Sequence, residues 1–126
     1  MIVLDASALL AYLFREQGYD IVESYIEQSC ISTVNLSEVA GRFVPDGIDA
    51  APLIYQIEQT AIKIVPFTQA HALHAANFIA QTQRYGLSLG DRACLALAKE
   101  KHLAVLTADT AWSQLVDIEV VQIRNS

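Results

Sequence analysis

Short apolar runs alternate along this chain with longer segments in which apolar residues recur every three or four positions. The runs are residues 2–5, 30–34, 62–67, 103–107 and 118–123, and their Val, Ile and Leu content favours buried β-strands. Helical spacing is found in residues 6–14, 19–29, 35–44, 50–61, 69–83 and 88–102, with a brief helical piece around Trp112. This alternation predicts an α/β fold with a parallel sheet and helices on both faces, because parallel neighbours need crossover connections.

Several helix starts carry capping signals. Ser88 followed by Asp91, and Asn35 followed by Glu38, fit the spacing of a capping box, and Thr68 fits an N-cap. The alanine-rich helix after Thr68 is expected to bury one small apolar face, made of Ala72, Ala75, Ala76, Ile79 and Ala80.

Composition bounds the class of protein. The 126 residues are 53% hydrophobic, which predicts one compact domain over residues 1–126. The apolar start lacks basic residues and is interrupted by Asp5, so neither a signal peptide nor a membrane span is predicted, and a cytoplasmic location is expected. The net charge of −6 has the wrong sign for long-range capture of a nucleic acid, so such a partner requires a local attraction.

Cysteine and histidine do not form a metal-binding pattern. Cys30 and Cys94 lie in apolar segments without ligand spacing, which predicts two buried thiols. His71 and His74 share a helix face but lack a third ligand nearby in the sequence, so they are interpreted as surface or core residues.

Four acidic residues follow or begin the predicted elements. Asp5 ends the first strand, Glu38 follows the second and Asp109 follows the fourth, so all three are expected at the carboxyl edge of the sheet. Asp91 begins a helix that leads into a strand, and it is expected at the opposite edge unless that helix is displaced. Helix capping explains each acid separately, and convergence of all four remains the alternative.

Convergence would have a clear chemical consequence. Two unit charges about 4 Å apart repel by roughly 4 kcal/mol at an effective dielectric constant near 20, so crowded carboxylates require cations or protons. Oxygen ligands without a Cys or His set favour Mg²⁺ or Mn²⁺. Such ions lower the pKa of water and neutralise phosphate charge, which suits phosphodiester hydrolysis. The sequence contains neither a Ser-His-Asp arrangement nor a glycine-rich phosphate loop.

Segments 2–7, 35–38, 87–98 and 106–109 together resemble the PIN-domain nucleases, specifically the VapC-type toxins. The resemblance implies a three-layer α/β/α fold with strand order 3-2-1-4-5 and a displaced helix carrying Asp91. It also implies a metal-dependent endoribonuclease, the toxin of a type II toxin–antitoxin pair, that leaves 5′-phosphate and 3′-hydroxyl ends. The expected partners are RNA, a second copy of the chain and an antitoxin that inserts into a groove between the first helices.

The resemblance also assigns roles to individual residues. The acid quartet that holds Mg²⁺ or Mn²⁺ would be Asp5, Glu38, Asp91 and Asp109. Ser7 and Thr107 would orient carboxylates or a metal-bound water. Arginine matches phosphate geometry, so candidate RNA contacts are Arg92, beside Asp91, and also Arg15, Arg42 and Arg84, although each also fits a plain surface charge. The aromatic residues that either line the antitoxin groove or belong to the core are Tyr12, Phe14, Tyr19 and Tyr25.

Two other functions fit parts of the pattern. A PIN-like module that binds RNA or an antitoxin without cleavage would carry the same acids, so only activity distinguishes it. A response-regulator receiver also has an acidic Mg²⁺ pocket, but it requires a lysine after a late strand. Here Lys101 precedes a strand and the last strand is followed by Arg124, so the receiver reading fits poorly.

Overall fold

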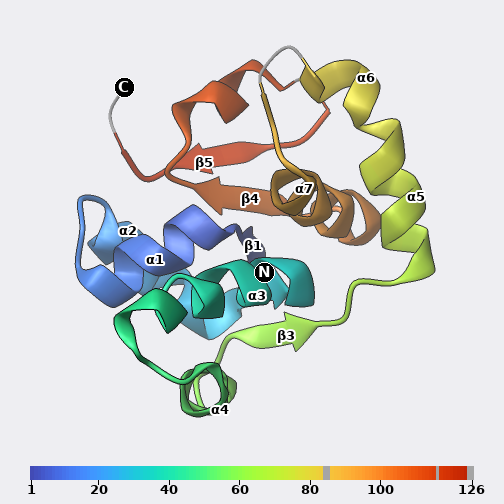
Figure 1. Ribbon diagram of the computed structural model, residues 1–126. Helices are drawn as coiled ribbons and strands as arrows, with labels where there is room; N and C mark the ends of the chain where they lie inside the picture. Colours follow the sequence, from blue (N-terminus) through green and yellow to red (C-terminus); the bar gives the residue numbers. More distant parts are fainter. Residues whose placement is uncertain (84–85, 116, 125–126) are drawn as a thin grey trace.

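Five parallel strands form one sheet in the order β3-β2-β1-β4-β5 in the computed structural model, which describes residues 1–83, 86–115 and 117–124 (Figure 1). The strands are β1 (Ile2–Leu4), β2 (Ser29–Ser32), β3 (Lys63–Val65), β4 (Ala104–Thr107) and β5 (Val120–Gln122). The central strand β1 places Val3 between Cys30 of β2 and Val105 of β4. The predicted parallel sheet and its strand order are confirmed.

Helices cover both faces of the sheet (Figure 1). They are α1 (Ala6–Phe14), α2 (Tyr19–Tyr25), α3 (Thr33–Gly41), α4 (Ala50–Glu58), α5 (Gln69–Asn77), α6 (Ile79–Thr82) and α7 (Leu89–Lys101), with 3₁₀ turns η1 (Ile26–Gln28), η2 (Val44–Asp46) and η4 (Thr110–Gln114). Leu4 and Leu106 pack into a core with α1 to α4, whereas Val3 and Val105 face the core formed with α7. This period-two alternation produces the three-layer sandwich.

The start of α3 differs from the prediction. The hydroxyl of Ser32 accepts the Val34 N–H at 3.2 Å, so Ser32 is the N-cap and ends β2. Asn35 lies inside the helix and is buried, with 1% of its surface exposed. The prediction of Asn35 as the cap was wrong because a serine three residues earlier offers an equivalent acceptor.

The predicted alanine face of α5 was wrong except at Ala75, because Ala72, Ala76, Ile79 and Ala80 are exposed. The buried residues of α5, α6 and the junction between them are His71, Ala75, Phe78 and Thr82, whereas Ile79 is 45% exposed. His71 is satisfied inside the protein, because Nδ1 accepts the Thr68 N–H at 3.3 Å and Nε2 donates to Glu100 Oε1 at 2.8 Å. With both ring nitrogens paired, His71 occupies an interior position beside Ala75, and Ala72, Ala76 and Ala80 face outward.

Both cysteines are free and buried, as expected. Burial raises the pKa of each thiol, most strongly that of Cys94, which keeps them protonated and unreactive. Within the described ranges, no helix has the length and apolar character needed to cross a membrane.

Candidate functional site

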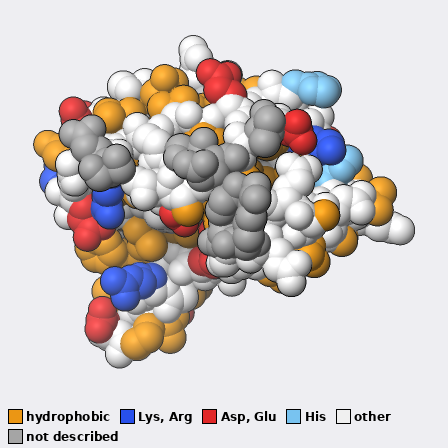
Figure 2. Space-filling model, turned by 90° about the horizontal axis from the view of Figure 1, so that it is seen from above, with side chains coloured by type: hydrophobic (Ala, Val, Ile, Leu, Met, Phe, Trp, Pro, Cys, Tyr) orange, Lys and Arg blue, Asp and Glu red, His pale blue; other side chains and the backbone are white. Residues whose placement is uncertain are grey.

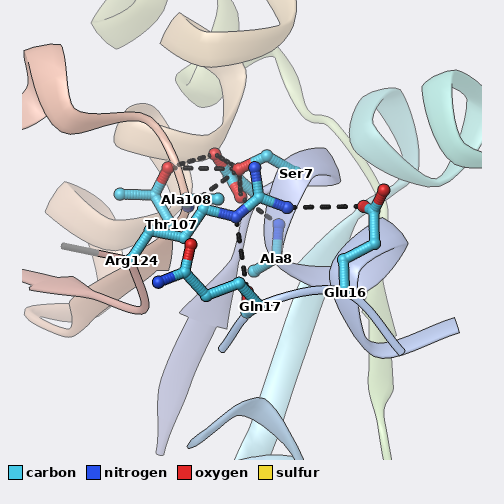
Figure 3. A network of polar contacts seen from close by, with 8 residues as sticks. Ser7, Ala8, Glu16, Gln17, Thr107, Ala108 and Arg124 are labelled. Carbon is cyan, nitrogen blue, oxygen red and sulfur yellow. Dashed lines mark hydrogen bonds and ion pairs between the residues drawn. The ribbon is translucent and has the colours of Figure 1, made fainter. Parts of the chain in front are cut away.

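Asp5 is the most enclosed of the four candidate acids, with 3% of its surface exposed. It directly follows β1, where it caps α1 by accepting the Ala8 N–H at 2.8 Å. The Ser7 hydroxyl donates to Oδ1 at 2.8 Å, and the Thr107 hydroxyl donates to Oδ2 at 2.5 Å. Figure 3 shows this group at the end of β1, with Ser7 and Thr107 converging from two segments 100 residues apart in the sequence.

The environment of Asp5 opposes its negative charge. The pKa of its carboxyl is raised from the ordinary 3.8 to about 6, mainly by burial and to a smaller extent by the negative charge of Asp91. The hydrogen bonds from Thr107, Ala8 and Ser7 act in the other direction and stabilise the ionised form. The site therefore holds an oriented carboxylate whose negative charge a nearby cation would stabilise.

Glu38 is held against the first turn of α7. The Asn35 side-chain amide donates to Glu38 Oε1 at 2.8 Å and to the Gly90 carbonyl at 2.9 Å. A Cβ atom on Gly90 would lie 2.3 Å from the same Oε1, so the absence of a side chain there leaves the space for the carboxyl. Partial burial raises the pKa of Glu38, the Asn35 hydrogen bond lowers it, and the charge of Asp91 raises it.

Asp91 lies at the carboxyl edge of the sheet, next to Gly90, without displacement of its helix. The expectation of the opposite edge was wrong, because a helix that leads into a parallel strand runs antiparallel to it and starts at the carboxyl edge. After α7 the chain turns at His102 and enters β4 at Ala104, so the first turn of this 13-residue helix lies about 20 Å away from that end. Asp91 also forms the predicted capping box with Ser88.

The structure thus brings three of the four acids into one electrostatic group. The charge of Asp91 raises the pKa of both Asp5 and Glu38, which come from β1 and α3. Capping accounts for the presence of Asp5 and Asp91 at this edge, because helices that lead into parallel strands start there. It does not account for Glu38, which caps no helix end, since the N-cap of α3 is Ser32. Asp91 therefore lies within electrostatic reach of both Asp5 and Glu38 at the carboxyl edge of the sheet.

Asp109 is connected to the group through its backbone. Its N–H donates to the Thr107 hydroxyl at 3.0 Å, and that hydroxyl in turn donates to Asp5. Its carboxylate is engaged elsewhere, because Oδ1 caps η4 by accepting the Ala111 N–H at 2.9 Å. Asp109 lies at the same edge of the sheet as the other acids, with its side chain directed to the following turn.

The candidate arginines are placed differently from one another. Arg92 donates from Nη1 to the Ala75 carbonyl at 3.0 Å, so its guanidinium joins α7 to α5. Arg15 lies 5.4 Å from the ring centroid of Tyr19, Arg42 is exposed after the end of α3, and Arg84 lies outside the described residues. Figure 2 shows acidic and basic side chains interspersed over the described part of one face, without a continuous field of either sign.

The acid group offers only carboxylate oxygens as possible metal ligands. Among the residues that the structure describes, no three Cys, His, Asp or Glu side chains are close enough to form a metal cluster. The second oxygens of Glu38 and Asp91 have no hydrogen bond to any described residue. The group is therefore open, with carboxylate oxygens that remain accessible beside the buried Asp5.

Two residues that support the group were missed in the sequence. Asn35 was interpreted as a helix cap, although it is the amide that joins Glu38 to α7. Gly90 received no role, yet a glycine inside a helical pattern signals a packing requirement. That signal identifies the position but not the Glu38 carboxyl that occupies the space.

Solved structures with the same fold include toxin–antitoxin proteins. A toxin–antitoxin complex from Klebsiella pneumoniae superposes with a TM-score of 0.76 at 19% identity over 100% of both chains. FitAcB from Neisseria gonorrhoeae gives a TM-score of 0.69 at 21% identity over 98% of both chains. VapC20 from Mycobacterium tuberculosis, a Sarcin-Ricin loop cleaving toxin, gives 0.70 at 16% identity over 94% of this chain and 99% of its own.

Sequence comparison gives the family. Among curated protein sequences, none matches the chain significantly. The family model of the PIN domain matches residues 2–118, which is nearly the whole chain. The strand order, the carboxylates at the carboxyl edge and this match agree, and the protein belongs to the PIN domain family.

Proposed function

We propose that this protein is a metal-dependent endoribonuclease and the toxin of a type II toxin–antitoxin pair. The observation that carries the proposal is the meeting of acids from separate segments at one edge of the sheet. Ser7 and Thr107 hold Asp5 there, and Asn35 holds Glu38 against Gly90, the neighbour of Asp91. Carboxylates so arranged favour a bound cation at neutral pH. Family membership and the toxins among the structures of the same fold support this choice of reaction.

The donor set fits Mg²⁺ or Mn²⁺. All the candidate ligands are carboxylate oxygens, and Mg²⁺ is usually held by one or two carboxylates with several waters rather than by a closed protein cage. The ligands would be Asp5 and Asp91, with Glu38 and Asp109 completing the group through their second oxygens or through water. When bound, the ion would supply a water of lowered pKa and positive charge for the phosphate.

The chain's own residues would position these groups. Ser7 and Thr107 donate to Asp5 and fix the orientation of its carboxylate, so that it need not reorganise during the reaction. Asn35 fixes Glu38 beside Asp91. Hydrolysis by attack of water on phosphorus with departure of the 3′ oxygen would leave 5′-phosphate and 3′-hydroxyl ends.

An apolar surface at the ends of α1 and α3 is the proposed antitoxin site. Phe14 stacks on Phe43 with ring centroids 5.1 Å apart, and Phe14, Val44 and Ile48 are each about half exposed. Beside them, α3 and α4 enclose a mostly apolar groove of about 380 Å³ that includes Leu36 and Ile54. Exposed apolar residues gathered in this way mark interaction surfaces. Of the aromatic residues named from the sequence, Phe14 belongs to this surface; homodimerisation stays a prediction.

The proposal is tested by RNA cleavage. The purified protein, incubated with a mixture of structured RNAs and Mn²⁺ or Mg²⁺, should produce fragments whose 5′ ends carry phosphate. EDTA should abolish the products, and Asp5→Asn or Asp91→Asn should lower the rate by at least 100-fold. Equal cleavage by wild type and both variants would identify a contaminating nuclease and refute the proposal.

A non-catalytic PIN-like module is the second candidate. Asp109 favours it, because one oxygen of its carboxylate is already engaged in capping η4. This reading predicts RNA or antitoxin binding that is unchanged in the Asp91→Asn variant and no cleavage with any divalent ion.

A further inference from the structure

The end of β5 is attached to the acid site through the backbone. The Ile123 N–H donates to the Thr107 carbonyl at 3.0 Å, and the Gln122 side chain donates to the Asp109 carbonyl at 2.7 Å. Thr107 is the residue whose hydroxyl contacts Asp5. Arg124, the next residue along the chain, therefore starts directly beside the segment that carries Thr107 and Asp109.

The Arg124 side chain is held only loosely. Its Nε donates to the Gln17 carbonyl and its Nη2 pairs with Glu16 Oε1, both at 3.3 Å. Figure 3 shows the guanidinium extending from the end of β5 to the loop after α1, at the same edge as Ser7 and Thr107. The Arg124 and Glu16 side chains are 35% and 53% exposed, and exposed ion pairs of this kind contribute little stability.

The loop that carries Glu16 is itself firmly placed. Gly18 has a φ of 92°, and a Cβ atom there would lie 2.3 Å from the Ile123 carbonyl oxygen. The backbones on both sides of the Arg124–Glu16 pair are thus fixed against each other. Only the two long side chains are free to change partners.

Other described cations near the site are committed to other contacts. Arg92 is bonded to the Ala75 carbonyl, and Arg15 lies over the Tyr19 ring. Lys99 and Lys101 lie in the last turn of α7, at the opposite edge of the sheet. A chain with a net charge of −6 needs a local cation to hold the backbone of RNA, and Arg124 occupies the suitable place.

We infer that Arg124 leaves Glu16 when RNA binds and contacts a backbone phosphate of the strand at the acid site. This inference rests on the proposed function and adds a substrate contact to it. A phosphate offers the guanidinium two well-oriented oxygens in place of the long contact with Glu16. Glu16 then acts as the carboxylate that occupies Arg124 before the substrate arrives, so its removal should favour RNA binding.

The test compares Arg124→Gln, Glu16→Gln and the control Lys101→Gln, which removes the same charge at the opposite edge. Steady-state cleavage of a fluorescent RNA with Mn²⁺ gives kcat and KM. Arg124→Gln is expected to raise KM about tenfold and to leave kcat within about twofold of wild type, because one charged hydrogen-bonding contact with the substrate is lost. Glu16→Gln is expected to lower KM. Lys101→Gln should change neither parameter.

Binding is measured separately, so that the inference does not depend on turnover. In an Asp5→Asn background, the fluorescence anisotropy of the same RNA should show weaker binding for Arg124→Gln and a salt dependence reduced by about one phosphate contact. If Arg124→Gln matches Lys101→Gln in RNA affinity and salt slope, the inference about Arg124 is wrong. Cleavage of RNA by the wild type would in that case still support the proposed function. If wild type binds RNA but never cleaves it, the proposed function fails and the salt slope still decides the role of Arg124.

Discussion

Replacement of Gly90 by alanine tests the placement of Glu38 directly. The new Cβ atom would lie 2.3 Å from Oε1 and 2.4 Å from Cδ and Oε2 of Glu38. Ordinary contact begins near 3.4 Å, so the carboxyl must retreat by about 1 Å. It can do so because it ends a flexible side chain, and the Asn35 hydrogen bond of 2.8 Å is then lost.

The expected result separates activity from stability. Misplacement of a catalytic group by about 1 Å can cost on the order of 100-fold in rate, and kcat should fall by roughly that factor. Stability should change little, because alanine favours a helix over glycine by about 1 kcal/mol, which offsets much of the lost hydrogen bond. The assay is RNA cleavage with Mn²⁺ together with thermal unfolding monitored by circular dichroism.

Gly41→Ala is the matched control. Gly41 also lies in a helix, and a Cβ atom there would meet nothing within 4 Å. This variant should keep wild-type kcat and gain slight stability. Full activity of Gly90→Ala, with Glu38→Gln strongly impaired, would refute the inferred position of the Glu38 carboxyl.

Three other variants test the surroundings of the site. Because the pKa of Asp5 is raised to about 6, the folded protein binds more protons than the unfolded chain between about pH 4 and 6, so stability without metal should fall as pH rises through this window. Asp5→Asn should remove that fall, on the order of 3 kcal/mol at most, in thermal unfolding with EDTA. Asn35→Ala should lower the unfolding free energy by about 2 kcal/mol and reduce kcat, measured by urea unfolding and RNA cleavage. His71→Ala should lower the free energy of unfolding in urea by about 2–4 kcal/mol. The kcat/KM of the folded protein should stay unchanged, since His71 joins α5 to Glu100, at the end of α7 opposite Asp91.

The sheet was predictable because its signal is local. Each strand is a short run such as residues 2–4 or 104–107, and the helical periodicity between runs permits only crossover connections. Cap positions were less predictable, since Ser32 and Asn35 offer similar acceptors and the buried environment of Asn35 arises only in the tertiary structure. The prediction of the buried face of α5 failed for the same reason. His71 is buried because Thr68, the cap residue, and Glu100, 29 positions away, bond its ring nitrogens.

The candidate acids could be selected from the sequence, but their contacts could not. Asp5 and Asp109 follow strands, so topology alone places them at the carboxyl edge. The bond between Asn35 and the Gly90 carbonyl joins residues 55 positions apart, and no local pattern encodes it. The same holds for the Thr107 hydroxyl on Asp5, which depends on the register of β1 and β4.

Anomalous diffraction from crystals soaked in Mn²⁺ would test the central claim most directly. A manganese peak bonded to oxygens of Asp5 and Asp91, with Glu38 or Asp109 reaching it directly or through water, is the predicted result. No peak at the carboxyl edge of β1 at saturating Mn²⁺, with these side chains still capping their helices, would contradict the account.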